Sequence, residues 1–305
     1  MNHDTAAPKL AGQRILVTGA TGFIGSALVK ALQQEGAQVS ALTRDRATCQ
    51  RLFGSSVDAI SLAQWPAGAR FDGVVNLAGA RIAPQPWTAG RRTTLRQSRI
   101  GTTEQLLRHL GTPPAVWVQA SAVGYYGLQD PAMAMTETQQ AGTDFAARLC
   151  ADWEAAAAPA ATAGSRLCTL RLGVVLGRGG ALPGLLFPIK LGIGGPMGSG
   201  QQAFPWIHLD DVLALILDCL SNPARSGVYN AVAPQAQTQA SFGRSAAKLL
   251  GRPFWLPFPA LPLRLLGDVS QLFLDGQPVA PARLQAEQWP WRFPTLESAL
   301  PGLLK

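Results

Sequence analysis

The sequence predicts an α/β protein with a doubly wound parallel sheet and a small, mostly helical C-terminal lobe. Strand-like and helix-like segments alternate through the first half, the strands are continuous apolar runs, and Gly- and Pro-rich chain follows residue 177. Continuous apolar strands are typical of parallel sheets that helices cover on both faces. We expect a sheet domain over 13–177, a cleft-lining segment that returns to it over 178–234, and the lobe over 235–305.

The first strand–helix–strand unit begins at Arg14. The chain reads RILVT, a glycine turn, an amphipathic helix that stops at Gly36, and the strand QVSALT. A helical crossover of this kind joins parallel strands. Further strands are expected within DGVVNLAG (72–79), AVWVQASAVG (115–124) and CTLRLGVVLG (168–177), separated by helix-compatible segments, and AAAAPAATAG (155–164) indicates a helix end and a turn.

The pattern changes after residue 177. Residues 178–200 are dense in Gly and Pro, which predicts a loop-rich segment around a cleft rather than another regular unit. A helix is expected to begin near His208, because Asp210 and Asp211 suit the first turn of a helix. From about residue 235, short helices and prolines predict the small lobe.

Composition excludes several classes of function. The net charge of +8 is dispersed, without a run of five or six Lys and Arg, so a phosphorylated cofactor accounts for local positive charge and no nucleic-acid partner is expected. The four cysteines are far apart in the sequence and only three histidines exist, which predicts neither a metal site nor a disulfide framework.

The sequence also favours an intracellular location. The first dozen residues lack the basic start and apolar stretch of a secretory signal, and no apolar run approaches the roughly 20 residues of a membrane span. We therefore expect a cytoplasmic protein without a membrane partner. A homodimer through helices on the sheet face is compatible with the fold.

A glycine turn joins the first strand to the first helix. Gly19, Gly22 and Gly25 form GxxGxxG, in which small residues allow a tight turn and close approach of the backbone to a pyrophosphate at the helix N-terminus. This strand–turn–helix context predicts dinucleotide binding, with Thr21, Phe23 and Ile24 completing the loop; the alternative is a merely tight turn.

The end of the second strand indicates which dinucleotide binds. NAD-binding proteins place a carboxylate there for the ribose 2′-hydroxyl, whereas this strand ends in Thr43 and Arg44. A guanidinium pairs with a 2′-phosphate, so NADP(H) is the expected cofactor. Asp45 follows directly and weakens this inference, and Arg44 as a solvated loop residue is the alternative.

Several segments together carry a family resemblance. They are NLAG (76–79), Trp87 followed by QSR (97–99), SAVGYYG (121–127), RLGVVLGRGGAL (171–182), GSGQQAFPWIHLDD (198–211), and the closing VAPARL and FPTLESAL. With the glycine turn, they make nearly the whole chain resemble the extended short-chain dehydrogenase/reductase superfamily. More narrowly, it is similar to the sugar nucleotide epimerase-like, NAD(P)-dependent branch with its own C-terminal domain.

The resemblance implies further cofactor contacts. NLAG would lie at the end of the fourth strand against the nucleotide, which implies contacts from Leu77, Ala78 and Gly79. Arg99 of QSR would be a second cofactor-contacting cation, although a helix-surface charge is the alternative, and Val175 would contact the cofactor from the strand after the catalytic helix.

The usual catalytic dyad of the superfamily is absent. Its members use a serine or threonine at the end of the fifth strand together with YxxxK. Ser121 fits the serine role, but the helix DFAARLCADWE places Ala146 at the tyrosine position and Cys150 at the lysine position. Glu154 shares their helix face. The stripe of Phe145, Leu149 and Trp153 indicates core packing.

Other residues are candidates for the active site. Tyr125 or Tyr126 can replace the missing acid, and we assign Tyr125 a catalytic and Tyr126 a substrate-binding role, with a structural role for both as the alternative. Gln201, Phe204, Trp206 and His208 are expected along the substrate pocket, although a structural imidazole at the start of the helix is the more favoured interpretation of His208.

Two functions follow from these observations. The first is an NADP-dependent, epimerase-like oxidoreductase that acts on a small carbonyl or hydroxyl compound, with Ser121 polarising the reacting oxygen. The second is a non-catalytic NADP(H)-binding regulatory or scaffold protein, since some relatives carry names linked to cell division. Both bind NADPH, so turnover distinguishes them.

Overall fold

The fold is built around a parallel sheet in the strand order β3-β2-β1-β4-β5-β6-β9. In the computed structural model, which describes residues 9–83, 85–128, 132–265 and 267–304, seven strands form this sheet. The N-terminal residues 1–8, part of the segment in which we expect no secretory signal, lie outside the described residues. The strands are β1 (Arg14–Thr18), β2 (Gln38–Leu42), β3 (Asp58–Ile60), β4 (Gly73–Asn76), β5 (Val116–Ala122), β6 (Arg166–Leu172) and β9 (Gly227–Ala231). This arrangement confirms the predicted doubly wound α/β fold.

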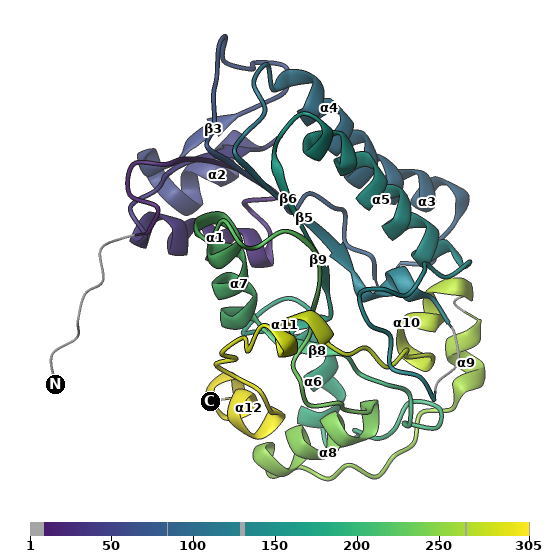
Figure 1. Ribbon diagram of the computed structural model, residues 1–305. Helices are drawn as coiled ribbons and strands as arrows, with labels where there is room; N and C mark the ends of the chain where they lie inside the picture. The colour runs from purple at the N-terminus through teal and green to yellow at the C-terminus, as the bar shows by residue number, and fades with distance from the viewer. Residues whose placement is uncertain (1–8, 84, 129–131, 266, 305) are drawn as a thin grey trace, which may run out of the picture.

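Helices cover both faces of the sheet (Figure 1). One face carries α1 (Phe23–Gln34), α2 (Arg46–Phe53) with the 3-10 turn η1 (Gly54–Ser56), and α7 (Leu209–Ser221). The other carries α3 (Ala89–Arg96), α4 (Thr102–His109) and α5 (Phe145–Thr162). Alternate residues of β1 enter the two resulting cores: Ile15 and Val17 lie in one cluster and Leu16 in the other. Because both faces are buried, the strand had to be apolar throughout.

The predicted strand 168–177 is two strands in two sheets, which corrects the sequence interpretation. β6 ends at Leu172, and β7 (Val174–Leu176) pairs in parallel with β8 (Trp206–His208) in a separate two-stranded sheet. Gly173 makes the transition, since its N–H donates to Ala231 O (3.1 Å) while that of Val174 donates to Pro205 O (2.8 Å). A Cβ at residue 173 would lie 2.7 Å from Pro205 O, so the crossing needs glycine.

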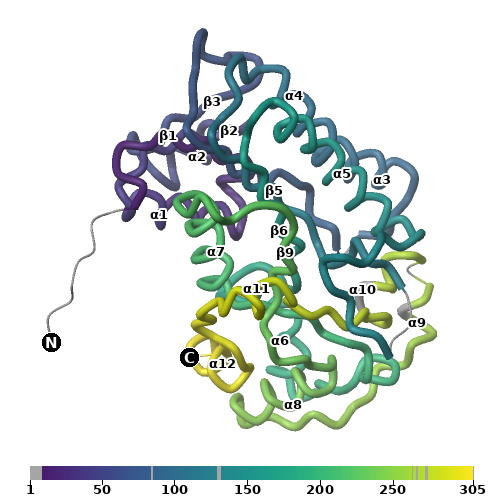
Figure 2. Tube along the Cα trace, viewed as in Figure 1, coloured from purple at the N-terminus to yellow at the C-terminus, as the bar shows by residue number. Residues whose placement is uncertain are grey.

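The C-terminal lobe is mostly helical, as predicted. It contains α8 (Gln239–Leu250), α9 (Ala260–Arg264), the 3-10 turn η4 (Gly267–Ser270), α10 (Gln271–Leu274), α11 (Ala282–Ala286) and α12 (Leu296–Leu304). The Gly- and Pro-rich segment 178–200 is less loop-rich than expected, because α6 (Leu182–Lys190) lies within it and packs Leu186 and Ile189 into the lobe core. Figure 2 follows the chain from the sheet into this lobe and back through α7 to β9.

Two helix boundaries among the described residues match the sequence analysis. α7 begins directly after His208, α5 ends at Thr162, and all four cysteines are free and buried. Within the same ranges, no group of three His, Cys, Asp or Glu side chains is arranged to hold a metal ion. Every helix of the described chain falls short of the length and hydropathy that a bilayer crossing requires.

Candidate cofactor and active site

The glycine turn joins β1 to α1 in a geometry that excludes larger residues. Gly19 has φ +67°, and a Cβ there would lie 2.7 Å from the carbonyl oxygen of Leu77. A Cβ on Gly25 would lie 2.1 Å from Gly19 O. Close backbone contact between the turn, the end of β4 and the first turn of α1 therefore depends on these glycines. Because β1 lies between β2 and β4, the turn lies at the point where the strand order reverses, which is where nucleotides bind in such sheets.

The N-terminus of α1 is suited to an anion. Its N-cap, Gly22, provides no side-chain cap, and no acidic residue occupies the first turn. Thr21 and Gly22 are exposed, whereas Ile24 packs against the core. A Cβ on Gly180 would lie 2.6 Å from the ring of Phe23, and therefore the glycines of 177–180 let that loop pack closely over the start of α1. The turn thus fits a pyrophosphate at the positive end of a helix.

At the end of β2, Arg44 is exposed while the neighbouring Asp45 caps helix α2. Asp45 is the N-cap of α2 and accepts from Thr48 N (2.9 Å) and Thr48 Oγ1 (2.6 Å). These hydrogen bonds, first the one from the Thr48 side chain, lower the pKa of Asp45. Thr43 is half-buried, and Arg44 is exposed and forms no ion pair with the described residues. The carboxylate that seemed to favour NAD therefore has a structural partner.

The NLAG segment follows β4 and lies against the glycine turn. Thr18 Oγ1 donates to Asn76 Oδ1 (2.6 Å) and accepts from Ala78 N (3.0 Å), which fixes the turn at Leu77 and Ala78. A Cβ on Gly79 would lie 3.0 Å from the guanidinium carbon of Arg99. The structure thus brings together the glycine turn and all three residues of NLAG that the resemblance implied.

Arg99 reaches this turn from a π-helical turn, η2 (Gln97–Gly101), between α3 and α4. Its guanidinium donates to Ala80 O (3.1 Å) and lies 5.1 Å from the centre of the Trp153 ring. Burial lowers its pKa, and it forms no ion pair within the described ranges. An inward-facing cation of this kind differs from a helix-surface charge.

Ser121 lies at the end of β5 in a buried charged network. Its hydroxyl donates to Glu154 Oε1 (2.6 Å). Arg171 clamps the same carboxylate with two hydrogen bonds, Nε to Oε1 and Nη2 to Oε2, each 2.9 Å. The exposed fractions of the Arg171 and Glu154 side chains are only 4% and 14%. The serine hydrogen therefore points to a carboxylate, and the serine itself is buried, at 2% exposed.

The two adjacent tyrosines of η3 (Val123–Tyr126) differ in environment. Tyr126 is fully buried, donates to Asn230 Oδ1 (2.6 Å) and accepts from Arg171 Nη1 (2.9 Å). Burial raises its pKa in spite of Arg171. Its predicted substrate-binding role stays a prediction. Tyr125 is half-buried, with the guanidinium carbon of Arg171 3.3 Å from its ring centre, and its predicted catalytic role stays a prediction.

The positions of the missing dyad face η3. A Cβ on Gly124 would lie 3.8 Å from Ala146 Cβ and 3.9 Å from Cys150 Sγ. Burial raises the pKa of the Cys150 thiol to about 12, in spite of Arg99 nearby. Neither residue replaces a tyrosine or lysine chemically. The apolar stripe of the same helix packs as predicted, with Leu149 and Trp153 buried and Phe145 against the same core.

The predicted substrate residues separate into exposed and buried positions. Gln201 is exposed. Trp206 is 1% exposed inside the lobe core, and its predicted substrate contact stays a prediction. His208 is the N-cap of α7, where Nδ1 accepts from Asp210 N (3.1 Å), and its ring lies 3.9 Å from that of Phe293. Burial lowers the pKa of His208. Val175 is half-buried in β7, beside the main core.

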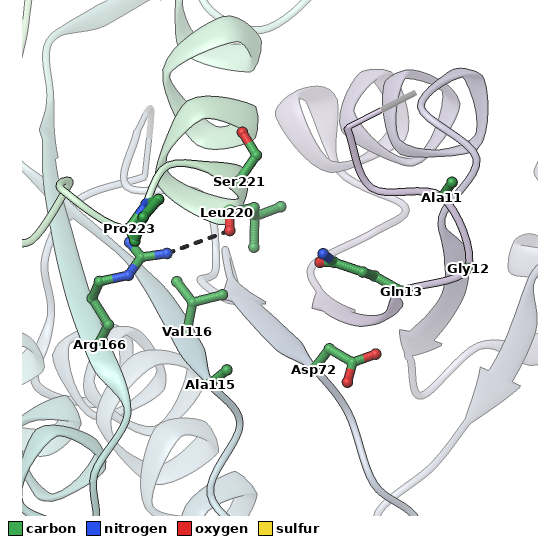
Figure 3. Close-up of a pocket in the computed structure, with 10 residues that line it drawn as sticks. All are labelled: Ala11, Gly12, Gln13, Asp72, Ala115, Val116, Arg166, Leu220, Ser221 and Pro223. Atoms are coloured by element: carbon green, nitrogen blue, oxygen red, sulfur yellow. Dashed lines mark hydrogen bonds between the residues drawn. The ribbon is translucent and has the colours of Figure 1, made fainter. Parts of the chain in front are cut away.

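A separate depression of about 590 Å³ opens at the other end of the sheet (Figure 3). Its lining includes Gln13, Asp72 and Arg166, at the amino ends of β1, β4 and β6. Arg166 donates to the carbonyl oxygens of Cys219, Leu220 and Arg225. Since sheets of this type bind ligands at the carboxyl ends of their strands, the depression is not the nucleotide site.

Sequence reasoning missed Arg171 and Asn230 and gave Glu154 no partner. One signal was present, because Arg171 interrupts the apolar run of CTLRLGVVLG. A buried guanidinium requires a carboxylate, and Glu154 lies on the neighbouring helix. No local pattern connects Asn230 with Tyr126, which are 104 residues apart.

Comparisons with known proteins agree with this geometry. Residues 15–232 match the NAD dependent epimerase/dehydratase family, and residues 258–301 match a domain of unknown function, DUF1731. The epimerase family protein SDR39U1 of Bos taurus is 36% identical over 300 residues, which cover 94% of this chain and 98% of that protein. An epimerase family protein of Staphylococcus saprophyticus is 37% identical over 303 residues, covering 95% and 98%.

Solved structures resemble the whole chain. Human epimerase family protein SDR39U1 (isoform 2) with NADPH superimposes with a TM-score of 0.85 at 33% identity, covering 95% of this chain and 99% of that one. UDP-glucuronic acid 4-epimerase from Bacillus cereus, in complex with UDP-glucuronic acid and NAD, has a TM-score of 0.74 at 18% identity, covering 95% and 98%. The second likeness concerns the fold alone.

Proposed function

Because the chain belongs to the NAD dependent epimerase/dehydratase family, we propose that it is an NADP(H)-dependent oxidoreductase that acts on a small hydroxyl or carbonyl compound. The observation that carries this proposal is the buried contact of Ser121 with Glu154, whose carboxylate Arg171 clamps. It supplies a route for a proton in a chain whose tyrosine and lysine positions hold Ala146 and Cys150.

The choice of NADP(H) has three supports. The glycine turn packs closely against the end of β4, and the N-terminus of α1 has no acidic residue in its first turn. Arg44 is exposed and unneutralised at the end of β2, where the cofactor's 2′-phosphate is recognised, while Asp45 caps α2. The human relative was solved with NADPH.

In the oxidation direction, a substrate hydroxyl donates its hydrogen to the free lone pair of Ser121. As the substrate C–H bond breaks, that proton passes to Ser121 Oγ, and the serine's own proton moves to Glu154 Oε1 over the 2.6 Å hydrogen bond. The bound nicotinamide supplies the acceptor for the hydride. In the reverse direction, Glu154 returns the proton through Ser121 to a carbonyl oxygen, while Arg171 keeps the carboxylate in place.

A second function, non-catalytic NADP(H) binding for regulation, is favoured by a different observation. Ala146 and the buried thiol of Cys150 stand at the dyad positions, and Tyr126 is engaged with Asn230 and Arg171. In this case the charged network would be structural. Only turnover separates the two functions, because both require the cofactor.

The experiment measures cofactor binding and turnover separately. NADPH and NADH are titrated into the purified protein, and oxidation of NADPH is followed with a panel of carbonyl compounds. Arg44→Ser is expected to weaken NADPH binding about tenfold or more and to leave NADH binding unchanged, because a charged hydrogen bond contributes about 1.5–3 kcal/mol. Arg46→Ser is the matched control, since Arg46 donates to Gln64 Oε1 on the protein surface.

For turnover, Ser121→Ala and Glu154→Gln are expected to remove activity while NADPH still binds. Ser165→Ala is the control, because Ser165 is also buried but precedes β6 at the other end of the sheet. Tyr125→Phe tests the predicted catalytic tyrosine. Failure of NADPH to bind saturably, or tighter binding of NADH, would contradict the cofactor assignment. Saturable binding with no turnover across the panel would favour the regulatory function.

A further inference from the structure

The lobe carries a concentrated exposed apolar surface. Of the twelve large apolar side chains that are exposed in the described residues, nine lie in this lobe. Eight of the nine, all except Leu249, define what we call the lobe patch: Phe187, Leu191, Ile193, Trp255, Leu256, Phe258, Leu261 and Leu265. Their exposed fractions run from 42% to 84%. Scattered apolar residues are ordinary on protein surfaces, whereas a concentration of this kind marks an interaction site.

Main-chain contacts make the lobe patch continuous. The segment after α6 runs beside the segment after α8, since Trp255 N–H donates to Gly194 O (2.9 Å) and Phe258 N–H donates to Pro196 O (2.9 Å). Phe187 and Leu191 are four residues apart at the end of α6, and Leu261 lies in α9. Figure 1 shows the segment between α8 and α9 along the outer edge of the lobe, away from the main sheet.

Trp255 is held outward by its polar end. Its indole N–H donates to Gly192 O (3.2 Å), while the side chain is 64% exposed. A Cβ on Gly195 would lie 1.8 Å from Leu256 O, so glycine lets the two segments pack directly against each other. The indole is therefore positioned before any partner binds, which lowers the entropic cost of docking.

The segments that carry the lobe patch hold charges of one sign, and the next acid along the chain, Asp268, is paired with Arg92. Residues 178–209 and 231–267 contain six Arg and Lys residues and no Asp or Glu: Arg178, Lys190, Arg244, Lys248, Arg252 and Arg264. All six are exposed, and none forms an ion pair within the described part of the chain. Unneutralised cations beside exposed Trp, Phe and Leu complement a surface that is both apolar and anionic.

We propose that the lobe patch docks this protein onto the surface of an anionic lipid bilayer. Aromatic and aliphatic side chains enter the headgroup boundary while Lys190, Arg252 and Arg264 contact lipid phosphates. A second copy of the chain fits less well, because a two-fold contact would bring these cations against each other. The sequence analysis expected no membrane partner because no apolar run is long enough to span a bilayer. Docking on the bilayer surface needs no such span. It leaves the glycine turn and the helices on the sheet face uncovered.

The test is flotation of the full chain with lipid vesicles. We expect binding to vesicles of phosphatidylcholine mixed with phosphatidylglycerol, weak binding to phosphatidylcholine alone, and release by raised salt. The triple variant Trp255→Ser, Phe258→Ser, Leu261→Ser should bind the mixed vesicles at least about tenfold more weakly, because it lacks three apolar side chains that docking would bury in the bilayer. Leu52→Ser is the matched control, since Leu52 is 47% exposed on α2, outside the lobe.

Two further measurements keep the result unambiguous. Unchanged NADPH binding by the triple variant shows that it folds. Trp255→Phe should remove a blue shift of tryptophan fluorescence that the mixed vesicles induce, while vesicle binding persists. Equal binding to both kinds of vesicle, equal binding by the triple variant, or a dimer in solution that the triple variant abolishes would each overturn the proposal.

Discussion

Replacement of Glu154 by methionine should strongly destabilise the protein. The carboxylate accepts hydrogen bonds from Arg171 at 2.9 and 2.9 Å and from Ser121 at 2.6 Å, and the Arg171 side chain is only 4% exposed. Without Glu154, a buried guanidinium keeps its charge and loses its counterion. Loss of one partner of a buried ion pair costs about 3–5 kcal/mol. We expect the free energy of unfolding to fall by that amount.

The double variant Glu154→Met, Arg171→Met tests the reason for this loss. Removing both charges replaces a desolvated pair by apolar groups of similar size, which is often nearly neutral. The double variant should therefore recover most of the loss, with a coupling energy of at least about 2 kcal/mol. Glu154→Gln, which keeps an acceptor for Arg171, should be intermediate.

Urea denaturation followed by circular dichroism measures these free energies, and Glu154→Gln provides a folded reference if Glu154→Met unfolds at room temperature. An unfolding free energy for Glu154→Met within about 1 kcal/mol of the wild type would contradict the reasoning, because it would mean that water solvates the unpaired Arg171. A double variant as unstable as the sum of its single variants would show that packing, and not charge, holds this region together.

Three further results are expected. Gly25→Ala should destabilise the protein and weaken NADPH binding, because the new Cβ would lie 2.1 Å from Gly19 O. Gly184→Ala should do neither, because Gly184 lies in α6 with open space around it. Calorimetry and NADPH titration compare the two variants, and equal effects would contradict the contact argument. Burial lowers the pKa of His208 below its ordinary value of 6.5, so the stabilisation by its neutral ring is present above pH 6.5 and is lost as pH falls toward the folded pKa. His208→Asn keeps an acceptor that can cap α7, and it should lose less stability over that pH interval in urea titrations. Parallel stability curves for the variant and the wild type would refute this. The four thiols should resist iodoacetamide at pH 8 in the folded protein and react after unfolding, since all are buried and burial raises the pKa of Cys150 to about 12. Rapid labelling of Cys150 in the folded protein, detected by mass spectrometry, would disprove its burial.

Local patterns were sufficient to predict much of the fold. The apolar runs within 14–18, 73–76 and 116–122 are strands because each has two buried faces, and the glycine turn is marked by residues adjacent in sequence. β3 was not predicted, since three residues carry too short a pattern. The single run 168–177 gave no sign of its division, because β6 and β7 are both apolar and only Gly173 separates them.

The charged part of the site could not be read from local sequence. Ser121 and Glu154 are 33 residues apart and Glu154 and Arg171 are 17 apart, so their contact depends on how α5 packs beside β5 and β6. The inward position of Arg99 depends on a π-helical turn, which changes the direction in which the following side chains point. The residues QSRIG contain no pattern that predicts this turn. The cofactor residues were easier to predict because they belong to one turn and the ends of neighbouring strands.

Gly173 connects the strand that carries Arg171 to the strand that enters the lobe. Arg171 holds Glu154 on the main-sheet side, and directly after the glycine Val174 pairs with Trp206, which lies in the lobe core. Leu172 alone separates Arg171 from Gly173, and Val174 follows Gly173 directly. A change in the position of the lobe relative to the main sheet would therefore move the backbone next to Arg171, whose guanidinium contacts the same carboxylate as Ser121.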